Sequence, residues 1–169
     1  MMDYFELFNL PISLTVNKAT IKKRYFELSR KFHPDFHSQT SEDEQAESLE
    51  KSAMLNKALK TLSNAEETMK YVLIHKGILE ENEKYQLPPD FLIEMMELNE
   101  QLMDAKMESA NELLQSLKLK IVEFEKDVYQ PIKDIVEHFQ EGVTSKEELL
   151  QVKKYYFQKK YLDRMLEGI

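Results

Sequence analysis

The sequence predicts an all-α fold. Its 169 residues include only 3 Gly and 5 Pro, whereas Leu, Lys, Glu, Met and Gln, which favour helices, are abundant. Apolar residues recur at spacings of three and four, which places them on one face of a helix. Several Ser or Thr residues are followed three positions later by Glu, the pattern of a capping box at a helix start. The length suffices for one medium domain or two small ones.

The first long helix is predicted after a short apolar segment, residues 4–10. Asn17 is its expected N-cap, and the helix runs to about Lys31. Pro34 disfavours helix at the residue before it, so a polar loop follows. The apolar residues of this helix are spaced by 4, 3 and 4, and therefore share one face: Ile21, Tyr25, Leu28 and Phe32.

Two further helices complete the N-terminal part. Ser41 and Glu44 form a capping box that opens the first of them. The pair Ser63-Asn64 ends it, and the next helix runs to Gly77, a typical C-capping residue.

A linker is predicted at residues 77–89. This stretch is charged and ends in Pro88-Pro89, which is typical of the start of a helix. We therefore assign residues 1–76 to one domain and residues 90–169 to a second.

The second domain opens with a helix from Asp90 to about Met107. A long apolar-periodic stretch follows over residues 113–139, and Pro131 inside it must kink or split the helix.

The last helix is predicted to begin at a capping box formed by Thr144 and Glu147. Its periodic pattern continues to about Leu166.

Composition excludes several functions. Cysteine is absent, which rules out disulfides, zinc–thiolate sites, cysteine nucleophiles and cysteine-held clusters in this chain. The acidic N-terminus does not resemble a signal or transit peptide, and no stretch approaches the roughly 18 apolar residues of a membrane helix. We therefore expect a cytoplasmic protein. The net charge of −8 argues against nucleic-acid binding.

Charge is distributed unevenly along the chain. Residues 15–31 hold six Lys or Arg against Glu27, whereas residues 90–112 hold seven Asp or Glu against Lys106. A basic patch and an acidic patch in different halves indicate two different partners.

The strongest local motif is His33-Pro34-Asp35, between two predicted helices. A basic helix precedes it, and a polar loop and a helix containing residues 55–62 follow it. This arrangement resembles a J-domain over residues 3–75. The resemblance implies that the three motif residues contact a DnaK-type chaperone and trigger its ATP hydrolysis.

The basic helix also fits this interpretation. Measured from Ile21 at about 100° per residue, three of its cations lie roughly 100° to 200° away and face solvent. Outward cations steer an acidic partner and orient it. The alternative is an ordinary solvated face without a partner, but the neighbouring HPD motif favours the docking interpretation. The three cations are Lys22, Lys23 and Arg30.

The loop residues also allow two other interpretations, a metal site and an acid–base pair. His33, Asp35 and His37 supply too few ligands for a closed metal site. A His–Asp acid–base pair would need a nucleophile or an oxyanion donor, and neither is evident. We therefore expect no enzyme activity, no metal and no cofactor.

The second domain resembles the C-terminal domain of HscB proteins, a three-helix bundle that holds an iron–sulfur cluster scaffold. The match lies in residues 91–98, followed by Glu100, Leu102 and Asp104. Residues 3–8 also look like the start of this family. The resemblance implies a J-domain and a three-helix bundle packed into an L-like shape.

Helical geometry separates a core stripe from a second face on the helix that starts at Asp90. The stripe is spaced by 4, 3, 4 and 3 residues: Phe91, Met95, Leu98, Leu102 and Ala105. A small apolar cluster beside a row of carboxylates lies largely off this stripe. The alternative is that a helix packed between two neighbours buries a wider arc, which would include Leu92 and Met96. The resemblance implies these scaffold contacts, with one more on the last helix: Leu92, Ile93, Met96, Glu97, Glu100, Asp104 and Phe157.

The family implies a monomeric co-chaperone that catalyses nothing itself. It would deliver an IscU-like scaffold protein to a specialised HscA-like heat-shock ATPase of the DnaK type and stimulate that ATPase, which assists the maturation of iron–sulfur proteins. The alternative is a general J-domain co-chaperone with a dimerising helical tail, in which residues 92–104 pair with a second copy.

Overall fold

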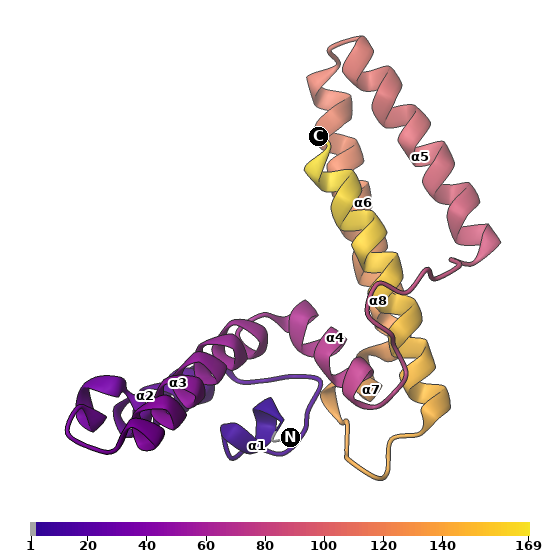
Figure 1. Cartoon of the computed structure of the whole chain (residues 1–169). Helices are drawn as coiled ribbons and strands as arrows, with labels where there is room; N and C mark the ends of the chain where they lie inside the picture. Colours follow the sequence, from indigo (N-terminus) through magenta and orange to yellow (C-terminus); the bar gives the residue numbers. More distant parts are fainter. Residues whose placement is uncertain (1–2) are drawn as a thin grey trace. The chain divides into compact units, whose positions relative to one another are not determined.

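The computed structural model of the chain describes residues 3–169, and all of its regular structure there is helical (Figure 1). The first two residues of the predicted 1–76 domain lie outside the described residues. The chain divides into two compact units. Residues up to Lys76 with Phe139–Val143 form the first, and Gly77–His138 with Thr144–Ile169 form the second. The predicted all-α fold is confirmed. No helix within residues 3–169 is long and apolar enough to cross a bilayer.

The first unit is built around a pair of helices. α2 packs against α3, and the short loop between them makes the pair antiparallel (Figure 1). Asn17 caps α2 by accepting a hydrogen bond from the Thr20 amide, and Ser41 and Glu44 form the predicted capping box of α3. The helices are α1 (Tyr4–Leu7), α2 (Lys18–Phe32), the 3₁₀ turn η1 (Pro34–His37), α3 (Glu42–Leu62) and α4 (Ala65–His75).

Aromatic and aliphatic side chains from every helix of this unit fill its core. The long helices are also tied by polar bonds: the Tyr25 hydroxyl donates to Asn56 Oδ1 over 2.9 Å, and the Ser48 hydroxyl donates to the Phe32 carbonyl. The second bond fixes the end of α2 against α3, so the loop that follows starts from a rigid position. The largest fully buried residues of the unit are Phe5, Phe8, Leu14, Ile21, Leu55, Leu62, Val72 and Leu73.

The second unit has three long helices, with α6 packed against both α5 and α8 (Figure 1). Pro131 lies in a 3₁₀ turn that separates α6 from the short α7, so the predicted interruption is confirmed. The elements are α5 (Pro89–Met107), α6 (Asn111–Tyr129), η2 (Gln130–Ile132), α7 (Lys133–Glu137) and α8 (Lys146–Glu167).

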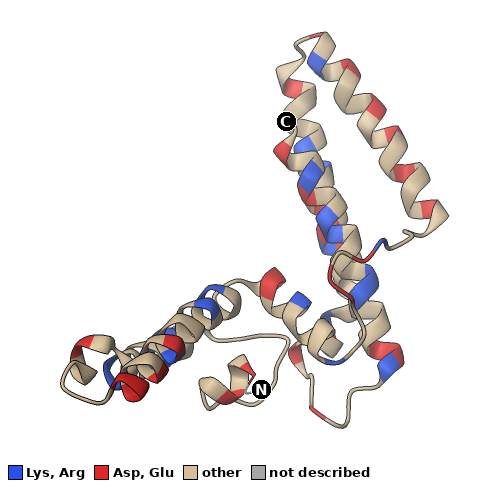
Figure 2. Ribbon diagram, viewed as in Figure 1, with Lys and Arg blue, Asp and Glu red and all other residues tan. Residues whose placement is uncertain are grey.

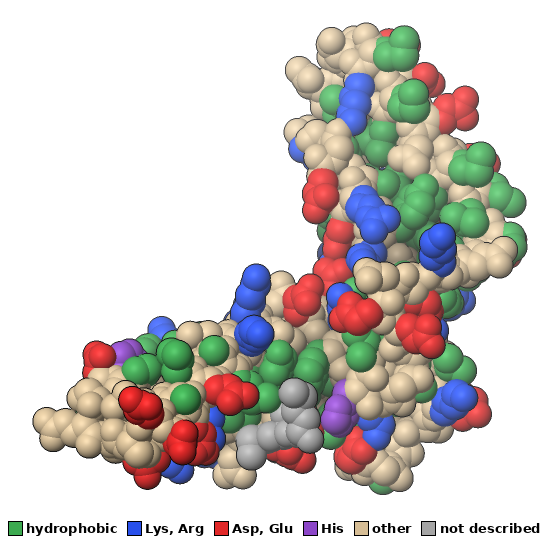
Figure 3. Space-filling model, viewed as in Figure 1, with side chains coloured by type: hydrophobic (Ala, Val, Ile, Leu, Met, Phe, Trp, Pro, Cys, Tyr) green, Lys and Arg blue, Asp and Glu red, His purple; other side chains and the backbone are tan. Residues whose placement is uncertain are grey.

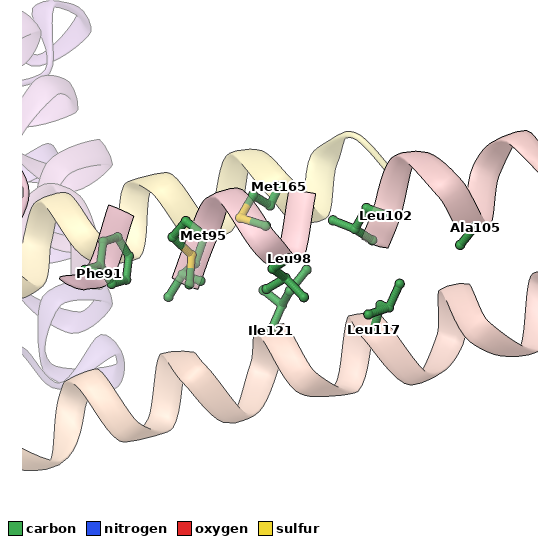
Figure 4. Close-up of a cluster of buried hydrophobic side chains, with 9 residues drawn as sticks. Phe91, Met95, Leu98, Leu102, Ala105, Leu117, Ile121 and Met165 are labelled. Carbon is green, nitrogen blue, oxygen red and sulfur yellow. The ribbon is translucent and has the colours of Figure 1, made fainter. Parts of the chain in front are cut away.

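The predicted core stripe of α5 is confirmed. All five residues are buried, with Met95 and Ala105 at 0% exposure. They pack against side chains of α6 and α8, and Figure 4 shows most of this cluster in close-up. The partners across the interface are Leu117 and Ile121 of α6 and Leu162 and Met165 of α8.

The start of α8 corrects one prediction. The capping box is formed by Ser145 and Glu148, one residue beyond the predicted pair Thr144 and Glu147. The Ser145 hydroxyl accepts from the Glu148 amide over 3.1 Å, and the Ser145 amide donates to Glu148 Oε1 over 3.0 Å. Both pairs satisfy the same three-residue spacing, so the motif alone could not separate them.

The segment between α4 and α5 lies against α8. Lys153 Nζ donates to the Ile78 carbonyl over 3.0 Å and pairs with Glu83 Oε2 at 2.6 Å. The Tyr85 ring stacks on Phe157, with centroids 4.5 Å apart and planes 6° from parallel. This irregular segment is therefore held by side-chain contacts.

The Lys153→Met variant tests that attachment. It keeps the apolar stem but removes the ammonium group, which takes away the donor to the Ile78 carbonyl and the cation that pairs with the Glu83 carboxylate. We expect the free energy of unfolding in urea to fall by about 1–3 kcal/mol, with faster hydrogen exchange at residues 78–85. The control is Lys51→Met, because Lys51 pairs with Glu47 and lies over the Phe32 ring at the surface, so its loss should cost less than about 1 kcal/mol and leave exchange at residues 78–85 unchanged. Unchanged exchange at these residues in Lys153→Met would contradict the prediction.

Candidate protein-interaction sites

The HPD loop is held by a backbone bond to α2 and by a bond to the His33 side chain. The His33 amide donates to the Ser29 carbonyl over 2.9 Å, which ends α2, and His33 Nδ1 accepts from the Asp35 amide over 3.2 Å. Pro34 occupies the first turn of η1, where its missing N–H costs nothing. The side chains of His33 and Asp35 stay 46% and 88% exposed. The loop therefore holds an imidazole and a carboxylate in place at the surface.

His37 turns back toward α2. Its Nε2 lies 2.9 Å from the Lys31 carbonyl oxygen, and the Thr40 hydroxyl donates to the His37 carbonyl over 2.6 Å. This side chain anchors the far end of the loop to the end of α2.

The basic face of α2 lies where the sequence predicts it. Ile21 is only 1% exposed and points into the core. The three cations Lys22, Lys23 and Arg30 are exposed. Exposed cations raise the rate of encounter with an acidic protein more than they raise buried contact energy. The helix therefore offers a positively charged approach beside the HPD loop.

The second candidate site is the outward face of α5. Ile93 and Met96 are 56% and 68% exposed, which is unusual for large apolar residues on a bundle helix. Figure 2 shows acidic residues spaced along α5, and Figure 3 shows hydrophobic side chains gathered on its surface. A shallow hollow is lined by Ile93, Met96, Glu97, Asn99, Glu100 and Met103.

The hollow brings together four of the seven predicted scaffold contacts. Ile93, Met96, Glu97 and Glu100 line it, whereas Leu92 is half-buried and Asp104 is exposed beyond it.

The face is also longer than predicted. Met103 and Met107 are 64% and 82% exposed and extend the apolar row toward the end of α5. Their spacing of 7 and 11 from Met96 is helical, so the sequence pattern contained this signal.

Phe157 lies in a different environment from the other predicted contacts. It is half-buried, its ring stacks on Tyr85, and it meets Tyr156 edge-on at 5.2 Å. It lines a separate hollow with Leu87 and Tyr161. One face of its ring is therefore already covered by the segment that precedes α5.

Models of two protein families match the chain. Residues 3–71 match the DnaJ domain, and residues 87–169 match a family described as the HSCB C-terminal oligomerisation domain. The co-chaperone protein HscB homolog of Haemophilus ducreyi is 31% identical over 163 residues, which cover 94% of this chain and 91% of that protein.

Similarity extends to animal proteins and to solved structures. The iron–sulfur cluster co-chaperone protein HscB of Mus musculus is 35% identical over 157 residues, but the chain spans only 64% of its length. The crystal structure of human co-chaperone protein HscB has a TM-score of 0.77 at 28% identity and covers 99% of this chain and 80% of that one. Chaperone HscB from Vibrio cholerae shares the fold, with a TM-score of 0.65 at 23% identity and 99% of both chains covered.

An exposed HPD loop on an antiparallel helix pair thus precedes a helical C-terminal domain, and relatives share this order over nearly the whole chain. The chain belongs to the HscB family of J-domain co-chaperones, which are not enzymes.

Proposed function

We propose that this chain binds an IscU-like iron–sulfur cluster scaffold and delivers it to an HscA-like ATPase of the DnaK type. The α5 face recruits the scaffold. The HPD loop and the basic face of α2 engage the chaperone and stimulate its ATP hydrolysis. The observation that carries the proposal is the presence, in one chain, of an exposed HPD loop and a C-terminal domain of the HscB family.

Burial supports the scaffold assignment. The fold does not need Ile93 and Met96, because the core of this unit is completed by the stripe on the other side of α5. Their exposed apolar surface, with Glu97 and Glu100 beside it, fits a partner that offers an apolar patch surrounded by positive charge.

Two single substitutions separate the two partners. The full chain is immobilised and exposed to cytoplasmic extract with ATP. We expect the wild type to retain both a cluster scaffold and a DnaK-type chaperone. His33→Gln should lose the chaperone and keep the scaffold, and Met96→Asp should do the reverse. Retention of neither protein by the wild type would refute the proposal, and so would loss of both proteins in either variant while that variant remains folded.

Charge reversal tests the approach surface. Replacing Lys22, Lys23 and Arg30 by Glu should slow association with the chaperone about 10- to 100-fold at low salt. The difference should shrink at about 0.5 M salt, where the Debye length is only a few ångströms. Stopped-flow association measured at several salt concentrations provides the test.

A matched control has the same net charge. Lys120, Lys126 and Lys133 are exposed in the second unit, and their replacement by Glu changes the total charge equally. If this control slows association as much as the α2 variant does, net charge and not the α2 face governs the encounter.

One observation favours a second candidate. The family model matched at residues 87–169 is described as an oligomerisation domain, so the α5 face could instead pair with a second copy. The expected result for the scaffold-binding function is a monomer of about 20 kDa at all concentrations, as measured by light scattering. A concentration-dependent dimer that Met96→Asp abolishes would support the alternative, a general J-domain co-chaperone with a dimerising tail.

A further inference from the structure

The unit that carries the HPD loop exposes two aromatic rings that its core does not use. Phe26 is 55% exposed and Phe36 is 69% exposed. An aromatic side chain can bury about 150–250 Å² of surface, so leaving two of them in water forgoes a large apolar contribution to folding. Both rings lie beside residues that the proposed function assigns to the chaperone.

Phe26 lies at the centre of the basic face. It follows Lys22 by four residues and Lys23 by three, and it precedes Arg30 by four. Residues three and four apart on a helix are neighbours, so the three exposed cations surround this ring. An apolar ring enclosed by charge has the layout of an interface anchor with a polar rim.

Phe36 extends the HPD loop itself. Its amide donates to the His33 carbonyl over 3.0 Å, and its ring meets the His33 imidazole edge-on, with centroids 6.3 Å apart and planes at 78°. The exposed Phe36 ring therefore lies directly beside the side chain that the proposed function presents to the chaperone.

We propose that Phe26 and Phe36 are the apolar anchors of the chaperone-docking face and that Phe26 makes this face selective for a DnaK-type chaperone with an apolar spot inside an acidic surface. The inference rests on the proposed chaperone interaction and is continuous with that site. The cations accelerate the encounter, and the rings supply contact that salt does not screen.

The test is a titration of the full chain into the single-turnover ATPase of each DnaK-type chaperone from the same organism. Phe26→Ala should raise the concentration for half-maximal stimulation about tenfold, and Phe36→Ala about fivefold. Maximal stimulation should be kept in Phe26→Ala because its HPD loop is intact. The control is Leu49→Ala on α3, which removes an apolar side chain that is 62% exposed and should leave the titration unchanged.

Phe26→Lys distinguishes an aromatic anchor from a purely charged face. This variant adds a fourth cation to the patch. If charge alone governs docking, Phe26→Lys should bind more tightly than the wild type at low salt. We expect it to bind more weakly, and we expect the defect of Phe26→Ala to be as large at high salt as at low salt.

Parallel measurement of His33→Gln separates two kinds of failure. If His33→Gln loses stimulation while Phe26→Ala and Phe36→Ala titrate like the wild type, the aromatic anchors are wrong and the chaperone role stands. Equal defects in Leu49→Ala would also overturn the inference. If the wild type stimulates none of the chaperones, the proposed function fails and the inference fails with it.

Discussion

Replacing His33 by Gln should abolish stimulation of the chaperone ATPase and leave the folding of the chain unchanged. The side chain is 46% exposed, and its hydrogen bond within the protein is made to the neighbouring Asp35 amide. A glutamine oxygen can accept the same bond, so the loop keeps its shape. The expected loss lies in the contact with the partner. Single-turnover ATP hydrolysis and thermal unfolding of the same preparation measure the two effects.

The other histidine of the loop provides the matched control. His37 is half-buried, and its ring is bonded to the Lys31 carbonyl. His37→Gln should therefore lower the melting temperature slightly while most of the stimulation remains. If both variants lose stimulation equally, the His33 effect reflects a disturbed loop and not a lost contact.

Substitutions at two adjacent methionines of α5 should have opposite effects: one should lower stability, and the other should weaken scaffold binding. Met95 is fully buried and Met96 is 68% exposed. Met95→Ala opens a cavity in the bundle and should cost about 2–5 kcal/mol of stability. Met96→Ala combined with Ile93→Ala should leave stability nearly unchanged but weaken scaffold binding by about 2–5 kcal/mol, because both side chains would be buried by the partner. Urea unfolding and calorimetric titration with the scaffold measure the pair.

Either of two results would overturn the assignment of this face. If the Ile93 and Met96 double variant unfolds as readily as Met95→Ala, these side chains contribute to the core and the face is not free. If it is as stable as the wild type and binds the scaffold normally, the scaffold docks elsewhere on the chain.

The parts of the fold that sequence predicted best depend on short-range rules. The core stripe of α5 follows from helical spacing alone, and the break near Pro131 follows from the missing N–H of proline. The helix start at Ser145 was missed by one residue because two overlapping pairs obey the same rule.

The environment of Phe157 could not be predicted in this way. Its stacking partner, Tyr85, lies 72 residues earlier in an irregular segment, and no periodicity connects the two. Whether an aromatic residue is covered depends on such tertiary contacts. Phe157 therefore remains a predicted scaffold contact, although its nearest aromatic neighbours belong to the same chain.

The exposed methionines of α5 also have a consequence in redox chemistry. Oxidation converts a methionine thioether into a polar sulfoxide, and exposed methionines react before buried ones. Met96, Met103 and Met107 are open to peroxide, whereas Met95 is shielded by the bundle. A mild oxidant would thus change the polarity of this face without unfolding the domain. Methionine sulfoxide reductases can restore the thioether, so the chemistry of this surface is reversible.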